Sequence, residues 1–163
     1  MSMREAILRF RELHQEFKAG AFKSPAAMTF YESERDDFLR ALLQAQQLTL
    51  RPGQSPRQAI RVGTALGLTL DIGPRRETTT TLDLGSAGFA AMLGGPLAPR
   101  IACEFELSLP TGALTGRARV VASTRDAAAA YRTSFAIDGV SDEGRARLEV
   151  TVIDTALEAF SKR

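Results

Sequence analysis

Two arginines that stand four residues apart, Arg57 and Arg61, have side chains suited to binding an anion. The guanidinium group stays charged and donates several hydrogen bonds in a planar geometry that matches phosphate groups and guanine edges. Both residues follow the stretch 51–56, whose two prolines and one glycine interrupt regular structure. An irregular loop there could bring both side chains to one ligand. The spacing alone is weak evidence for a site.

A second candidate is the segment 83–88, with the sequence Asp-Leu-Gly-Ser-Ala-Gly. Glycines allow a ligand to approach the backbone closely, and exposed N–H groups can hold a phosphate. The same residue types also occur in an ordinary tight turn in which the Asp side chain accepts from the backbone. Taken alone, the segment favours the ordinary turn.

The elements that must position these residues begin with two helices. Residues 3–19 carry apolar side chains at helical spacing, and Gly20 stands where such a helix would end. Ser24 as cap and Pro25 at the first helical position predict a second helix that runs to about Leu48. We therefore predict an N-terminal helical hairpin over residues 1–50.

After residue 56 the apolar period changes from 3.6 to 2, which indicates strands. Leu82 and Leu84 are expected on one face of their strand, and Ser141 opens a final helix. The predicted fold is mainly β with helices, a small antiparallel β-barrel over 51–163 that includes a C-terminal helix. About six strands are predicted, at 66–72, 77–84, 89–93, 101–109, 118–122 and 131–137.

Composition argues against several classes of function. The net charge of +2 over 163 residues is too small to predict bulk nucleic-acid binding. The single cysteine, Cys103, excludes an internal disulfide and is expected in the core, and the single histidine, His14, lies in no ligand pattern. We find no serine elbow, phosphate-binding loop or metal-ligand cluster, so we predict no catalytic residue, no metal and no cofactor. No segment is long and apolar enough for a signal or a membrane span, which predicts a cytoplasmic protein without a membrane partner.

Taken together and in this order, the two motifs resemble those of the PilZ family. Its signature is an R-x-x-x-R pair leading into the first strand, then [D/N]-x-S-x-x-G between the second and third strands. Arg57 and Arg61 match the pair, and Asp83 and Gly88 match the ends of the second motif. The motif's serine falls on Gly85, with Ser86 one position later. The resemblance covers about residues 51–160 and leaves the helical hairpin outside it.

The resemblance implies a bacterial receptor that binds cyclic di-GMP, performs no chemistry on it and signals to a partner by conformational change. Arginine can pair with guanine O6 and N7 or neutralise a phosphate, which makes the arginines the expected affinity residues. Asp83 is suited to accept from guanine N1–H and the exocyclic amine, which makes it the expected specificity residue. Either Ser86 or the N–H group of Gly85 would replace the motif's serine. The implied ligand-binding residues are Arg57, Arg61, Asp83, Gly85, Ser86 and Gly88.

Two other functions stay open at the level of sequence. One is a PilZ-like adaptor that binds only protein and has lost the ligand. The other is a small RNA-binding barrel, against which stand the few aromatic side chains outside core-facing positions. The apolar stripe of Met3, Ile7, Phe10 and Phe17 needs cover from the barrel or from a second subunit. Of these, we favour a homodimer joined through the N-terminal helices.

Overall fold

The computed structural model describes residues 2–48, 59–126 and 129–161, so Arg57 lies outside the described residues. The chain forms two compact units, Met1–Ile60 and Arg61–Arg163, and each is described here by itself. None of the helices in the described ranges combines the length and the hydropathy needed to cross a bilayer.

The first unit consists of α1 (Met3–Lys18) and α2 (Pro25–Leu48), which confirms the two predicted helices. Ser2 caps α1 in a capping box with Glu5, so both residues satisfy N–H groups of the first turn. Gly20 adopts φ +80° just after α1, a conformation that ends a helix and favours glycine. The Ser24 hydroxyl accepts from the Ala27 N–H at 3.1 Å and begins α2.

Stacked rings fill the space between α1 and α2. Phe10 stacks on Phe38 with centroids 4.4 Å apart, and Phe17 stacks on Tyr31 at 4.1 Å. His14 is buried, and its Nδ1 lies 2.7 Å from the Tyr31 hydroxyl oxygen. The packing within this unit therefore covers most of the α1 apolar stripe, which was expected to need cover from the barrel or a second subunit.

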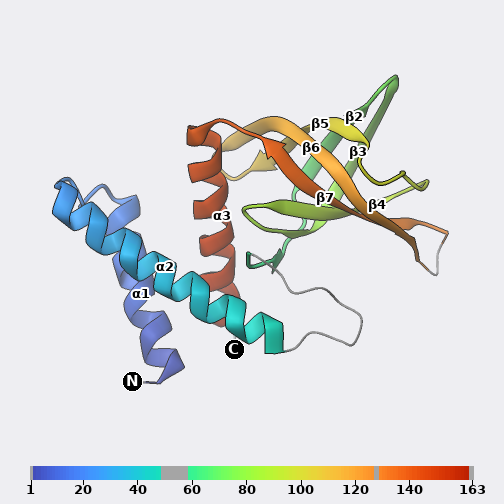
Figure 1. Ribbon diagram of the computed structural model, residues 1–163. Coiled ribbons are helices and arrows are strands. Elements are labelled where there is room, and N and C mark those ends of the chain that lie inside the picture. The colour runs from blue at the N-terminus through green and yellow to red at the C-terminus, as the bar shows by residue number, and fades with distance from the viewer. Residues whose placement is uncertain (1, 49–58, 127–128, 162–163) are drawn as a thin grey trace. The chain divides into compact units, whose positions relative to one another are not determined.

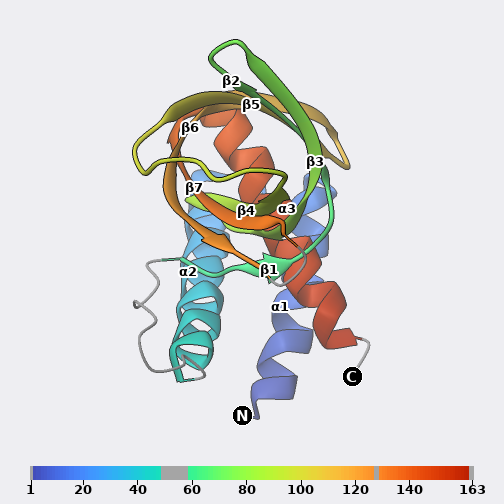
Figure 2. The same ribbon diagram turned by 90° about the vertical axis from the view of Figure 1, so that its right-hand side faces the viewer.

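The second unit is a closed antiparallel barrel of six strands with one more strand outside it (Figures 1 and 2). Neighbouring strands follow the order β3, β2, β5, β6, β7, β4, and β4 pairs back with β3 to close the barrel, while β1 pairs with β3 from outside. This confirms the predicted fold class. The strands are β1 (Val62–Gly63), β2 (Gly67–Ile72), β3 (Arg75–Leu84), β4 (Gly88–Leu93), β5 (Ala102–Leu109), β6 (Gly112–Arg125) and β7 (Tyr131–Gly139).

Alternating side chains of these strands build the barrel core. Strand β5 shows the pattern most cleanly, with every second residue buried from Cys103 to Leu109. Cys103 lies in the core as predicted, and burial, with a smaller contribution from Asp138, raises the pKa of its thiol to about 11. Phe89 and Phe135 stack at 5.1 Å, and both side chains are fully buried.

One expectation about strand β3 is wrong. Leu82 is 37% exposed whereas Leu84 is fully buried, so the two do not share the core face. The register with β4 shifts between Thr81 and Asp83, which marks a β-bulge. A bulge inserts an extra residue and breaks the period of two, so Thr81 rather than Leu82 faces the core.

Helix α3 (Asp142–Ser161) begins at Ser141, whose hydroxyl accepts from the Gly144 N–H at 3.0 Å, and this confirms the predicted C-terminal helix. Its side chains Leu148, Ile153 and Leu157 are buried. Arg147 donates to the carbonyl oxygens of Gly112 at 2.8 Å and Ala113 at 3.2 Å, and to the Thr111 hydroxyl at 3.1 Å. These bonds hold α3 against the β5–β6 turn.

Candidate functional site

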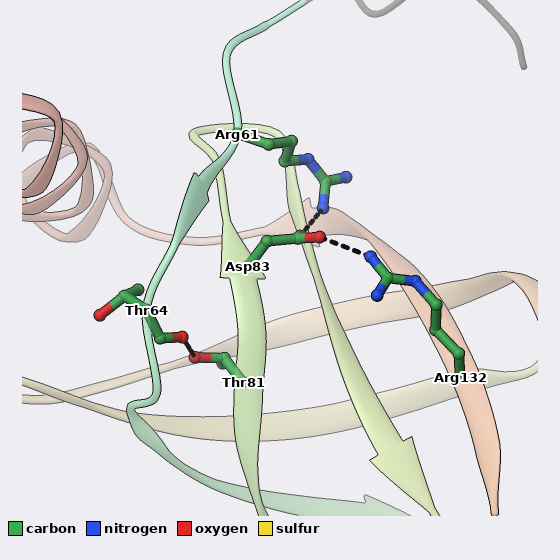
Figure 3. Close-up of polar contacts among 5 residues, drawn as sticks. All are labelled: Arg61, Thr64, Thr81, Asp83 and Arg132. Atoms are coloured by element: carbon green, nitrogen blue, oxygen red, sulfur yellow. Dashed lines mark hydrogen bonds and ion pairs between the residues drawn. The ribbon is translucent and has the colours of Figure 1, made fainter. Parts of the chain in front are cut away.

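Arg61 is positioned by the short strand β1. Val62 pairs with Leu84 and Gly63 with Asp83, so the residue just before β1 lies beside the end of β3. From there the Arg61 Nη1 donates to Asp83 Oδ1 at 2.8 Å (Figure 3). The side chains are 24% and 15% exposed, which reduces solvent screening of the pair relative to a fully exposed one.

A second arginine, Arg132 on β7, reaches the same carboxylate. Its Nη2 donates to Asp83 Oδ2 at 2.8 Å, so each oxygen of Asp83 accepts from a different guanidinium group (Figure 3). Arg132 was not predicted as a site residue from the sequence, because it is 49 positions away from Asp83 and belongs to no motif. The one sequence signal is its place in β7, where inward-facing Thr133 and Phe135 put Arg132 on the outer face.

The turn between β3 and β4 is closed by its own backbone. The Gly85 N–H donates to the Gly88 carbonyl at 2.8 Å, and the Ile137 N–H donates to the Ala87 carbonyl at 2.9 Å. The Gly85 N–H is therefore already engaged within the turn. Ser86 is half-buried, and its carbonyl accepts from Arg145 Nη1 of α3 at 3.3 Å. Arg145, which was also not predicted, brings a further positive charge to the turn.

Gly88 has a steric reason to be glycine. A Cβ atom built there would lie 2.2 Å from the Phe135 carbonyl oxygen and 2.9 Å from Arg61 Nη2. The first distance is far below any contact that a backbone atom tolerates. The second shows that the Arg61 guanidinium lies directly over Gly88, so the missing side chain makes room for it.

A buried threonine holds the segment between β1 and β2 in place. The Thr81 hydroxyl donates to the Thr64 carbonyl at 2.5 Å (Figure 3) and accepts from the Leu66 N–H at 2.9 Å. Thr81 is 2% exposed, so both bonds are shielded from water. The bulge in β3 turns Thr81 toward the core. From there Thr81 fixes the segment that follows β1, the short strand that begins just after Arg61.

The structure thus brings together five of the six residues predicted for the site, namely Arg61, Asp83, Gly85, Ser86 and Gly88. Arg57 lies outside the described residues. Three guanidinium groups gather around one carboxylate and one glycine turn, an arrangement suited to an anion with hydrogen-bonding edges. Within the described ranges, no three His, Cys, Asp or Glu side chains are grouped as metal ligands would be.

No protein-family model and no curated protein matches the sequence. Solved structures do match. The PilZ domain of YcgR from Escherichia coli, solved with cyclic di-GMP, aligns with a TM-score of 0.54 at 16% identity, over 66% of this chain and 97% of that domain. MrkH of K. pneumonia in complex with cyclic di-GMP aligns with a TM-score of 0.59 at 17% identity, over 68% of this chain and 57% of MrkH.

The inhibitor of motility MotI/DgrA of Bacillus subtilis aligns with a TM-score of 0.57 at 14% identity, over 68% of this chain and 54% of that chain. This chain therefore spans little more than half the length of MotI/DgrA and MrkH. At these identities the similarity concerns the fold, and the fold is PilZ-like.

Proposed function

We propose that this protein is a cyclic di-GMP receptor that binds the dinucleotide at Arg57, Arg61 and the 83–88 turn and performs no chemistry on it. One observation carries the proposal. On a PilZ-like barrel, the second arginine of the R-x-x-x-R pair lies 2.8 Å from the acid that opens the turn and directly over the glycine that ends it. Residues from the two sequence motifs thus lie side by side, which supports the proposal. Two of the matching structures, those of YcgR and MrkH, were solved with cyclic di-GMP.

Each residue has a chemical role in this proposal. Arg61 and Arg57 bind a phosphate or the O6 and N7 edge of guanine through charge-assisted hydrogen bonds. Asp83 accepts from guanine N1–H and the exocyclic amine. Two carboxylate oxygens offer about four lone pairs, and two are used by Arg61 and Arg132, so acceptor capacity remains for guanine. With the Gly85 N–H engaged in the turn, the Ser86 hydroxyl replaces the serine of the motif.

The position of the arginines suggests how binding is signalled. Arg61 is the first residue of the second unit, and Arg57 precedes it on the segment that leads from the helical hairpin. A ligand held by both arginines and by the 83–88 turn restricts that segment relative to the barrel. We propose that this restriction alters how the hairpin is presented to a downstream protein.

The adaptor function is the second candidate, and one observation favours it. Position 85 lacks the hydroxyl of the motif, and the Gly85 N–H already donates to Gly88. A protein that had lost the ligand would show such a change. The RNA-binding function has less support, because most described aromatic rings are buried or stacked on one another and Phe30, at 48%, is the most exposed.

Calorimetric titration of the intact chain separates these functions. The receptor proposal predicts binding of cyclic di-GMP at micromolar or lower Kd, and no comparable heat with a short single-stranded RNA. Absence of both heat and a melting-temperature shift at millimolar cyclic di-GMP would refute the receptor and leave the adaptor. Binding of RNA alone would establish the third function.

A further inference from the structure

The Arg132 side chain reaches Asp83 across strand β4, whose outward-facing residues at this place, Gly88 and Ala90, are very small. Asp83 pairs with Ala90 in β4, and Ala90 pairs with Ser134 in β7. Paired residues of adjacent strands point to the same face of a sheet, and alternate residues of one strand share a face. Ala90 therefore shares the outer face with Asp83, with Arg132 and with Gly88 two residues before it.

Gly88 has no side chain and Ala90 has only a methyl group, so β4 leaves space above both residues. Ala90 is only 1% exposed although it lies on the outer face, which places it beneath neighbouring side chains. Arg61 lies over Gly88, and Arg132 reaches Asp83 from the β7 side of Ala90. The two guanidinium groups thus approach one another above Gly88 and Ala90, from opposite sides of the Asp83 carboxylate.

Three guanidinium groups lie near one carboxylate at this place. Arg61 and Arg132 share Asp83, and Arg145 adds a third guanidinium group at Ser86. Arg132 keeps 49% of its side chain exposed, so part of its donor capacity is open to a ligand. A carboxylate that holds two arginines fixes their direction before the ligand arrives, which reduces the entropy lost on binding.

We infer that Arg132 is a third ligand-binding arginine of this site and that Asp83 is the residue that positions it together with Arg61. This inference rests on the proposed function, because the ligand is the same. Arg132 contacts a phosphate of cyclic di-GMP from the β7 side, and Arg61 contacts the ligand from the β1 side. The site therefore extends beyond the two motifs.

The test is titration of the intact chain and the variant Arg132→Ala with cyclic di-GMP over a range of salt concentrations. Loss of a hydrogen bond to a charged group raises Kd about 10-fold or more. A lost ion contact also makes Kd less dependent on salt, which a purely structural change would not do. Arg132→Lys keeps the charge without the planar fork and should recover part of the affinity.

Arg76→Ala is the matched control. Arg76 is an exposed strand arginine paired with Asp71 at 3.5 Å, and it lies on β3 like Asp83 but about 23 Å away along the strand. It should leave both Kd and salt dependence unchanged. The positioning role of Asp83 is tested by Asp83→Asn, alone and combined with Arg132→Ala. If Asp83 acts partly through Arg132, the second change costs less affinity in the presence of the first.

The outcomes are distinct. If the intact chain binds and Arg132→Ala matches it in Kd and salt dependence, this inference is wrong and the proposed function stands. If the two changes are additive, Asp83 does not position Arg132. If the intact chain does not bind cyclic di-GMP, both the inference and the proposed function fail.

Discussion

Asp83 links two arginines of the candidate site, Arg61 and Arg132. Its carboxylate is 15% exposed and accepts one hydrogen bond from each of two arginines at 2.8 Å. Removing one member of a partly buried ion pair leaves the other charge without compensation, so these residues are coupled rather than independent. The effect of substituting one of these three residues on binding should therefore depend on whether the other two are present.

The arginine pair should dominate affinity. We predict that Arg57→Ala and Arg61→Ala each weaken cyclic di-GMP binding by about 1.5–3 kcal/mol, the contribution expected of hydrogen bonds to charged groups. Calorimetric Kd values measure this, with Arg76→Ala as the control for the loss of an exposed arginine. Unchanged affinity in Arg61→Ala would contradict the role of Arg61 in the proposed function.

Asp83 should select cyclic di-GMP over cyclic di-AMP, in addition to positioning Arg61 and Arg132. Guanine presents N1–H and the C2 amine side by side as donors to a carboxylate, whereas adenine N1 is an acceptor and the adenine amine is on C6. We therefore predict that Asp83→Ala reduces the ratio of the Kd for cyclic di-AMP to that for cyclic di-GMP. Parallel titrations with the two ligands measure this ratio. An equal loss for both ligands would show that Asp83 only shapes the turn and orients the arginines.

At the scale of elements, the turn between β3 and β4 connects folding to binding. Gly88 lies beneath Arg61 and against the Phe135 carbonyl. We predict that Gly88→Ala lowers the free energy of unfolding by about 1–3 kcal/mol through overpacking, and that it also weakens cyclic di-GMP binding by displacing Arg61. Denaturant unfolding and calorimetry measure the two effects.

Gly94→Ala is the control for this change, because a Cβ atom at Gly94 would meet nothing within 4 Å. It should leave stability and Kd close to those of the intact protein. If Gly88→Ala retains full affinity, then the close approach of Arg61 to the turn does not contribute to binding.

The helices and strands were largely predictable from the sequence. Helix ends follow from local signals at Ser24 and Gly20, and the strands follow from alternation that the barrel requires. The bulge at Leu82 was not predictable, because the period of two places Leu82 and Leu84 on one face, and only the pairing with β4 decides otherwise.

In the candidate site, too, some contacts were predictable from local sequence and others depend on how the strands pair. Asp83 and Gly88 are five positions apart, on either side of one turn, so their proximity follows from local sequence. The approach of Arg132 to Asp83 depends on β7 lying beside β4 in the closed barrel. A contact that depends on the order of strands in the sheet leaves no spacing signature in one sequence.

At the scale of the whole molecule, the helical hairpin contributes the exposed apolar side chains that bear on the oligomeric state. Its apolar stripe is mainly covered within its own unit, where Ile7 and Phe10 are buried. Met3, Leu8 and Phe30 stay 53%, 45% and 48% exposed. These exposed side chains, of which only Met3 belongs to the stripe, are the reason to expect a second subunit.

We retain the homodimer through the N-terminal helices as a proposal with a direct test. Light scattering at tens of micromolar should give the mass of a dimer for the intact chain. Phe30→Glu, which replaces one exposed apolar side chain with a charged one, should shift that mass toward the monomer. A monomeric mass for the intact chain would refute the dimer, and a dimer unaffected by Phe30→Glu would place the interface elsewhere.

Another cleft on the barrel is electrostatically unsuited to cyclic di-GMP. A cleft of about 450 Å³ is lined by Thr69, Thr115, two arginines and three carboxylates, Asp71, Glu104 and Glu106. An anion there would face an excess of negative charge. At Arg61, by contrast, three guanidinium groups lie near the carboxylate of Asp83. Binding at one place or the other therefore predicts that different residues respond to the ligand.

The most direct test of the central claim is therefore NMR mapping of the isotope-labelled intact chain during titration with cyclic di-GMP. We predict the largest chemical-shift changes at the amides of Gly85, Ser86 and Gly88 and at the side-chain Nε of Arg61 and Arg132. The amides of Thr69, Glu104 and Thr115 should move little. Largest changes around the cleft, or no change at the 83–88 turn at saturating ligand, would contradict the account.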